Sequence, residues 1–138
     1  MSNIKFSVII PVFQKGPFLS KCIESVLKQS FKDYEIILVD DGSTDNSSEI
    51  CKNYSVKNEN VFYYYKENSG VSATRNFGIN KANNDYIALI DADDFWDKDF
   101  LFEIVRLIKK YPNCGMYSTG FSKLTNGLSI ENDSGIKG

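Results

Sequence analysis

The chain has 138 residues, of which 42% are hydrophobic and 25% charged, and its net charge at pH 7 is −2. This length supports one domain with a workable core, and the scattered lysines and arginines argue against a nucleic-acid-binding stripe. The sequence contains no histidine, which excludes His-based triads, His general bases and His-containing zinc sites from this chain.

The cysteines and the N-terminus indicate the cellular compartment. Cys22, Cys51 and Cys114 are far apart and form no CxxC pair, so we expect buried, reduced thiols. The first residues lack the basic and apolar regions of a signal peptide, and no apolar run has the length of a membrane span. We therefore expect a cytoplasmic protein with no membrane span in this chain and no nucleic-acid partner.

Apolar runs alternate with amphipathic segments along the first 110 residues. The predicted strands are Phe6–Val12, Glu35–Val39, Val61–Tyr65 and Tyr86–Ile90, with a further candidate at Met116–Thr119. The predicted helices begin at Pro17, at Ser43 or Thr44 as the cap, at Val71 and at Phe100, and the last ends before Tyr111-Pro112.

This alternation predicts the fold class and the domain organisation. Continuous apolar strands between helices are typical of a Rossmann-like α/β fold, with a mostly parallel sheet covered by helices on both faces. We expect residues 1–121 to form the domain. Residues 122–138 are rich in Gly, Asn and Ser without periodicity, so we expect an aperiodic tail.

The strongest chemical signal is the sequence Asp91-Ala92-Asp93, which directly follows the strand Tyr86–Ile90. Neighbouring carboxylates repel one another and raise each other's pKa unless a cation lies among them. The alternation of an extended chain would place Asp91 and Asp93 on one side. Mg²⁺ or Mn²⁺ prefers oxygen ligands and keeps positions open for substrate phosphates, so we expect a metal that holds a phosphate.

Other strand ends carry polar residues at the edge where open parallel sheets bind ligands. Asp40 and Asp41 follow the second strand, and one of them can serve as a helix cap while the other contacts a base or ribose. Arg75 is one of two arginines, and its planar side chain suits a phosphate or carboxylate, although a surface ion pair is the alternative.

Four segments together resemble the inverting glycosyltransferase family 2, whose catalytic domain has the GT-A fold. The matching segments are Ser7–Phe13, Ile36–Asp45, Asn68–Asn76 and Ile87–Trp96, in the order of the family. The resemblance implies that Pro11 and Phe13 line a nucleotide pocket, that Asp40 and Asp41 contact uracil or ribose, that Arg75 lies near the base or diphosphate, and that Asp91 and Asp93 form the DxD motif with Asp93 as direct ligand of Mn²⁺ or Mg²⁺.

The resemblance also implies a function. A sugar would be transferred from a nucleoside-diphosphate donor, expected to be a UDP-sugar, to an unknown saccharide or lipid-linked acceptor in cell-surface polysaccharide synthesis. Family members continue beyond this length and supply the general base there, and neither Glu131 nor Asp133 matches that base. We therefore expect a truncated GT-A domain that holds the donor and metal half of the site, and that is inactive by itself.

Three alternatives belong to other classes. A nucleotide-binding or assembly module without activity would keep the same fold. A receiver-like signalling domain also binds Mg²⁺, but it places its aspartate pair after the first strand and needs a lysine after the fifth. A Rossmann dehydrogenase would have GxGxxG after the first strand, which is absent here.

Overall fold

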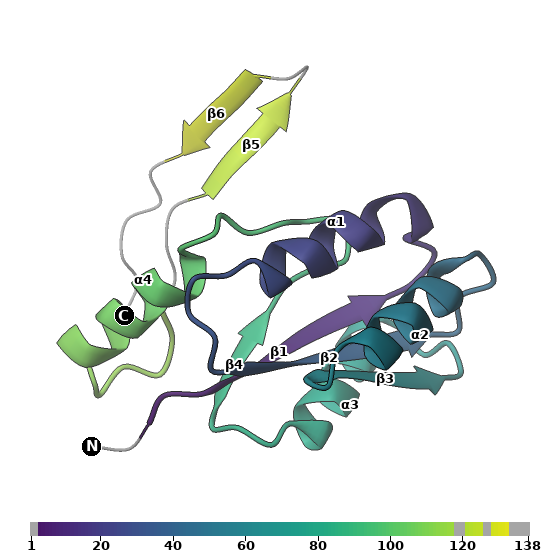
Figure 1. The fold of residues 1–138 in the computed structure, drawn as a ribbon, viewed down its shortest axis with the longest axis horizontal. Helices are drawn as coiled ribbons and strands as arrows, with labels where there is room; N and C mark the ends of the chain where they lie inside the picture. Colours follow the sequence, from purple (N-terminus) through teal and green to yellow (C-terminus); the bar gives the residue numbers. More distant parts are fainter. Residues whose placement is uncertain (1–2, 118–120, 126–127, 133–138) are drawn as a thin grey trace. The chain divides into compact units, whose positions relative to one another are not determined.

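The computed structural model describes residues 3–117, 121–125 and 128–132. The chain divides into two compact units, the first comprising Met1–Lys28 and Lys32–Asp97, the second Gln29–Phe31 and Lys98–Gly138. The larger unit contains four parallel strands in the order β3-β2-β1-β4, as Figure 1 shows. These strands are β1 (Phe6–Val12), β2 (Tyr34–Asp41), β3 (Val61–Lys66) and β4 (Tyr86–Leu89). The predicted Rossmann-like α/β fold is confirmed.

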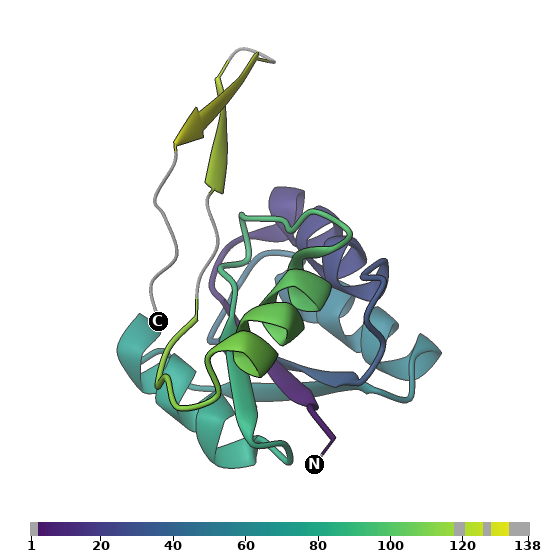
Figure 2. The same ribbon diagram turned by 90° about the vertical axis from the view of Figure 1, so that its left-hand side faces the viewer.

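Three helices cover both faces of this sheet. They are α1 (Gly16–Leu27), α2 (Ser47–Lys57) and α3 (Val71–Lys81). The two views in Figures 1 and 2 place α1 and α2 on one face and α3 on the other. Gly78 lets α3 approach closely, because a Cβ at this position would lie 2.5 Å from Cγ2 of Ile9. Every residue of β1 and β2 is buried, which explains their continuous apolar sequences.

The strand order creates a switch point between β1 and β4. From β1 the chain moves to β2 and β3 on one side, and it returns through α3 to form β4 on the other. Ile90 N–H donates to Ile9 C=O (3.2 Å), so Ile9 and, two residues further along β1, Pro11 face β4 rather than β2. The missing N–H of Pro11 therefore removes no bond from the ladder between β1 and β2, and the pairing of β1 with β4 ends at Ile9 and Leu89. Ligands of open α/β sheets bind at such a crevice.

A buried polar network at the opposite end of the sheet fixes the entry to β4. The Glu35 carboxylate accepts hydrogen bonds from the Ser7 hydroxyl (2.7 Å) and from the backbone and side-chain N–H of Asn83 (2.8 and 3.0 Å). Burial by itself raises the pKa of Glu35, but the bonds from Asn83 and Ser7 outweigh it and lower that pKa. The network holds the segment before β4 against β1 and β2.

The second unit contains α4 (Phe100–Lys110) and an antiparallel hairpin of β5 (Phe121–Thr125) and β6 (Leu128–Asn132). Gln29 Oε1 accepts from Leu101 N–H (2.9 Å) in the first turn of α4. The hairpin corrects our expectation of an aperiodic segment after residue 121. The sequence Asn126-Gly127, which separates β5 from β6, is favoured in two-residue hairpin loops. The Gly-, Asn- and Ser-rich composition of the segment, taken alone, indicates a loop instead.

Two further expectations differ from the structure. Met116 and Tyr117 are not in a strand, and the rest of that predicted strand lies outside the described residues. The helix α2 begins at Ser47 after Asn46, not after Ser43 or Thr44, because the hydroxyls of those two residues are bonded to Gln14 instead. None of the helices in the described part of the chain has the length and apolar character needed to cross a bilayer.

Candidate functional site

Three carboxylates gather in the turn after β4. The carboxylates of Asp91, Asp93 and Asp94 each offer an oxygen, and these oxygens lie within 4.8 Å of one another. The strand ends at Leu89 and Asp94 N–H donates to Asp91 C=O (3.0 Å), so a turn rather than strand alternation brings the side chains together. This all-oxygen donor set fits Mg²⁺ or Mn²⁺, which prefer carboxylate and water ligands.

Two cationic side chains pair with this acidic cluster from different elements. Arg75 on α3 places Nη2 2.9 Å from Asp91 Oδ1, and Lys15 after β1 places Nζ 3.5 Å from Asp93 Oδ2. The second pair crosses the switch point between β1 and β4. The two alternatives for Arg75, a role in ligand binding and a surface ion pair, are therefore compatible. Its ion-pair partner Asp91 is itself a predicted metal ligand.

The charge of the cluster acts on its neighbours. Burial, and then the charges of Asp93 and Asp91, raise the pKa of Asp94. The thiol of Cys22 donates to Asp91 C=O (3.4 Å) from beneath the turn. Burial, followed by the three cluster carboxylates, raises the pKa of Cys22 to about 12, so this thiol stays neutral and serves packing rather than nucleophilic chemistry.

Asp40 lies at the end of β2 and is 0% exposed. Its Oδ1 accepts from Ser43 N–H (2.9 Å), and its Oδ2 accepts from the hydroxyls of Tyr63 (3.0 Å) and Ser48. Burial, together with the bond to Asp40 and its charge, raises the pKa of Tyr63 to about 12 against the lowering effect of Ser48. The predicted contact of Asp40 with a nucleotide requires these groups to move.

Asp41 anchors the loop that leads into α3. Its carboxylate accepts from Lys66 Nζ (2.9 Å), from Ser69 N–H (2.8 Å) and from Gly70 N–H (3.1 Å). Burial alone raises the pKa of Asp41, but these bonds and the charge of Lys66 lower it overall. Gly42 follows at φ 78°, a left-handed conformation that glycine adopts without strain. The turn and the next loop are thereby held together.

The two apolar residues predicted to line the pocket occupy different environments. Pro11 is buried in β1 at the side of the switch point. Phe13 follows the strand and is 46% exposed, so its ring is available to a planar ligand.

Several residues at this edge of the sheet were not among the site residues predicted from the sequence. Asp94 joins Asp91 and Asp93, Lys15 pairs with Asp93, and Gln14 bonds to the loop after β2. Asp94 was visible as a third carboxylate in the same turn. No sequence pattern indicates a role at the site for Lys15 or Gln14, because their partners are distant in the sequence.

Together these features define a doubly wound α/β domain with an oxygen-rich, cation-flanked acidic cluster at its switch point. A family model described as Glycosyl transferase family 2 matches residues 7–131. The chain belongs to this family, which confirms the resemblance inferred from its sequence.

Relatives and solved structures agree with this membership. The chain is 39% identical over 107 residues to the glycosyltransferase GlyA of Streptococcus pneumoniae, covering 78% of the chain and 15% of GlyA. It is 44% identical over 93 residues to the uncharacterized glycosyltransferase YibD of Escherichia coli, covering 67% of the chain and 27% of YibD. The chain thus spans well under half the length of these relatives.

Solved GT-A structures share the fold. The structure of S. aureus TarS 1–349 in complex with UDP-GlcNAc matches with a TM-score of 0.73 and 29% identity, covering 79% of this chain and 32% of that one. The mannosyltransferase PcManGT from Pyrobaculum calidifontis, in complex with GDP-Man and Mn²⁺, matches in fold with a TM-score of 0.67 and 20% identity, covering 75% of this chain and 32% of its own.

Proposed function

We propose that this chain forms the donor-binding part of a metal-dependent, inverting glycosyltransferase that uses a nucleoside-diphosphate sugar, with UDP as the nucleotide. Asp93 and Asp91 hold Mn²⁺ or Mg²⁺. The nucleotide is bound by Pro11, Phe13, Asp40, Asp41, Arg75 and Asp91. The acceptor is a saccharide or lipid-linked sugar, and the general base is not among the residues assigned here.

The observation that carries this proposal is the acidic cluster at the switch point, with a cation paired to each of two carboxylates. Three carboxylates with one divalent ion still leave a net negative charge, which repels a diphosphate. Lys15 and Arg75 change the balance to one net positive charge, so the cluster with its metal attracts the diphosphate. The solved structure of TarS, which shares the fold of this chain, holds UDP-GlcNAc and supports the choice of donor class.

Each group has a separate part in the proposed reaction. A divalent ion bound at the cluster supplies charge neutralisation for the departing diphosphate. Arg75 presents several N–H donors to the same phosphates, and the exposed ring of Phe13 offers a stacking surface to the base. Glycosyl transfer passes through an oxocarbenium-like state, so stabilising the leaving group lowers the barrier directly.

Calorimetry on the chain tests the proposal. UDP and GDP are titrated with and without Mn²⁺ into the wild type, Asp93→Ala and the control Asp85→Ala, an exposed residue before β4 at the opposite end of the sheet. We expect UDP to bind only with Mn²⁺, binding to be lost in Asp93→Ala, and Asp85→Ala to match the wild type. Metal-independent UDP binding, or equal binding by Asp93→Ala, contradicts the proposed site.

A second measurement separates donor binding from transfer. Release of UDP from a UDP-sugar, with and without candidate saccharide acceptors, reports turnover by the chain alone. We expect binding with little turnover, because no general base is assigned. Rapid transfer to an acceptor would contradict a donor-only role, while metal-dependent binding with no turnover in any longer form would favour a binding module.

A further inference from the structure

Gln14 has a backbone conformation that needs an explanation. Its φ is 53°, and it is the one non-glycine residue with positive φ in the part of the chain that the structure describes. A long side chain in the left-handed region costs free energy, and such a residue persists only where surrounding bonds hold it in place. Gln14 lies directly after β1, beside the switch point.

The bonds that hold Gln14 all come from the loop after β2. Its backbone N–H donates to the Ser43 hydroxyl (3.0 Å), and its Nε2 donates to the Thr44 hydroxyl (2.9 Å). Its Oε1 accepts from the backbone N–H of Thr44 (2.7 Å) and of Asp45 (3.1 Å). One side chain therefore uses both of its ends to order a loop about thirty residues away in sequence.

The two residues after Gln14 make further hydrogen bonds to the segment after β2. Lys15 N–H donates to the Ser47 hydroxyl (3.1 Å), and Gly16 N–H donates to Asp45 Oδ2 (3.0 Å). The backbone N–H groups of Lys15 and Gly16 are thus both hydrogen-bonded to the segment after β2. The Nζ of Lys15 lies 3.5 Å from Asp93 Oδ2. The hydrogen bond between the Gln14 and Thr44 side chains is exposed, so it adds little to folding stability. Its main effect is to orient the two loops relative to each other.

We propose that Gln14 is a positioning residue of the donor site, which clamps the loop after β1 to the loop after β2 and so holds Lys15 against the acidic cluster and Phe13 at the pocket edge. The inference rests on the proposed function, because the site that Gln14 orders is the proposed diphosphate and metal site. Gln14 itself contacts neither the metal nor the nucleotide. It acts through the orientation of its two neighbours.

The first test needs no ligand. Amide hydrogen exchange at Thr44 and Asp45 is measured in the wild type, Gln14→Ala, Gln14→Glu and the control Asn60→Ala, which removes a side-chain bond to Tyr34 C=O elsewhere on the sheet. We expect about tenfold faster exchange in Gln14→Ala, and retained protection in Gln14→Glu, whose carboxylate still accepts both N–H groups. Unchanged exchange in Gln14→Ala overturns the clamp.

The second test separates positioning from stability. Gln14→Gly relieves the backbone strain but lacks the clamp, so we expect it to melt at or above the temperature of Gln14→Ala while binding UDP with Mn²⁺ as weakly, about tenfold below the wild type. If affinity instead follows melting temperature across the three proteins, the role is structural and the inference is wrong. Absence of UDP binding by the wild type would overturn the proposed function, which is a different result from equal binding by wild type and variants.

Discussion

The guanidinium of Arg75 lies 2.9 Å from the Asp91 carboxylate, and this ion pair joins α3 to the turn after β4. Only Nη2 takes part, while Nε is buried with no hydrogen-bond acceptor among the described residues. A buried donor without an acceptor is costly, and an ion pair this exposed contributes little to folding stability. Arg75 is therefore held loosely enough to exchange Asp91 for an oxyanion that engages more of its donors.

Replacing Arg75 should weaken nucleotide binding without weakening metal binding. We expect Arg75→Ala to reduce the affinity for UDP with Mn²⁺ by about tenfold, because two charge-assisted hydrogen bonds to phosphate are lost. Arg75→Lys should recover only part of the loss, since lysine lacks the planar pair of donors. Calorimetry with UDP and with Mn²⁺ alone measures both terms.

The other arginine of the chain provides the matched control. Arg106 lies on α4 and pairs with Glu103 at 3.0 Å on an exposed surface. Arg106→Ala removes the same charge and should leave UDP affinity unchanged. An equal loss in both variants would attribute the effect to net charge rather than to the position of Arg75.

Lys15 should affect metal and nucleotide in opposite directions. In Lys15→Met the cation beside Asp93 is gone, so Mn²⁺ alone should bind about two- to fivefold more tightly, as expected for an exposed, screened ion pair. UDP should bind the metal-loaded variant more weakly, because the diphosphate loses a positive charge. Electron paramagnetic resonance of free Mn²⁺ measures the first effect, and calorimetry measures the second.

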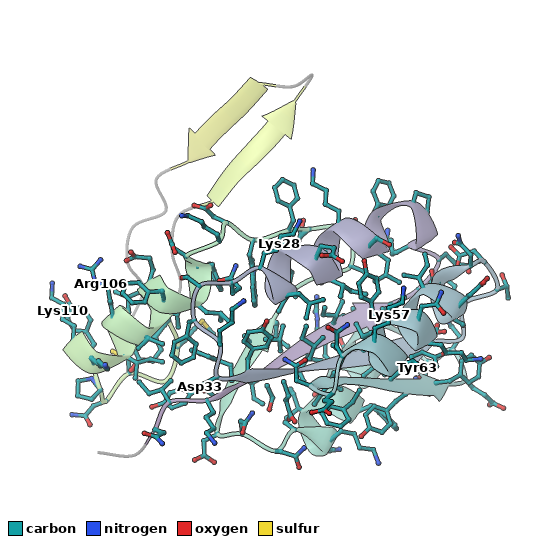
Figure 3. The ribbon with its side chains drawn as sticks, viewed as in Figure 1. Lys28, Asp33, Lys57, Tyr63, Arg106 and Lys110 are labelled. Carbon is teal, nitrogen blue, oxygen red and sulfur yellow. The ribbon has the colours of Figure 1, made fainter. Side chains whose placement is uncertain are left out.

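Lys28→Met is the control for that change, since Lys28 is exposed at the far end of α1 and is labelled in Figure 3. It alters the net charge equally without approaching the cluster. A rise in Mn²⁺ affinity in Lys28→Met as large as in Lys15→Met would show a long-range charge effect and remove Lys15 from the site.

The acidic cluster should lose its metal as the pH falls, with Asp94 protonated earlier than an ordinary aspartate. Burial and the two neighbouring carboxylates raise its pKa above 3.8, and a protonated carboxyl is a poor ligand. We expect Mn²⁺ affinity to decrease as the pH is lowered from neutral, and this decrease to be smaller in Asp94→Asn, which binds more weakly throughout. An identical pH profile in the variant would mean that Asp94 does not ligate the ion.

The hydroxyl of Tyr63 should stabilise the end of β2, which carries Asp40. Tyr63 lies on β3 in Figure 3, and its hydroxyl donates to the fully buried Asp40 carboxylate at 3.0 Å. Tyr63→Phe leaves that carboxylate short of a donor and should cost about 1–3 kcal/mol in the free energy of unfolding. Tyr65→Phe, at a 59% exposed position on the same strand, should cost almost nothing. Urea denaturation of both variants tests this difference.

Local patterns were sufficient for most elements of the fold and failed where distant residues compete. The strands β1 and β2 are continuous apolar runs because both faces of the sheet are covered, so their sequence reports their burial. The predicted start of α2 was wrong because the hydroxyls of Ser43 and Thr44 are bonded to Gln14. This residue is distant in the sequence, so no local rule includes it. The hairpin of β5 and β6 was not predicted, because the Gly-, Asn- and Ser-rich composition of this segment indicates a loop even though Asn126-Gly127 favours a hairpin.

Sequence patterns were enough to predict the alternation of strands and helices, the family, and the position of Asp91 and Asp93 at the end of a strand. These features depend on neighbouring residues, whose spacing reports burial and turn formation directly. The folded chain was needed to show that β1 lies beside β4, that a turn adds Asp94 to the cluster, and that Lys15 and Arg75 pair with the cluster. Those relationships join residues far apart in the chain, so they follow from strand order and packing, which the periodicity of a sequence does not encode.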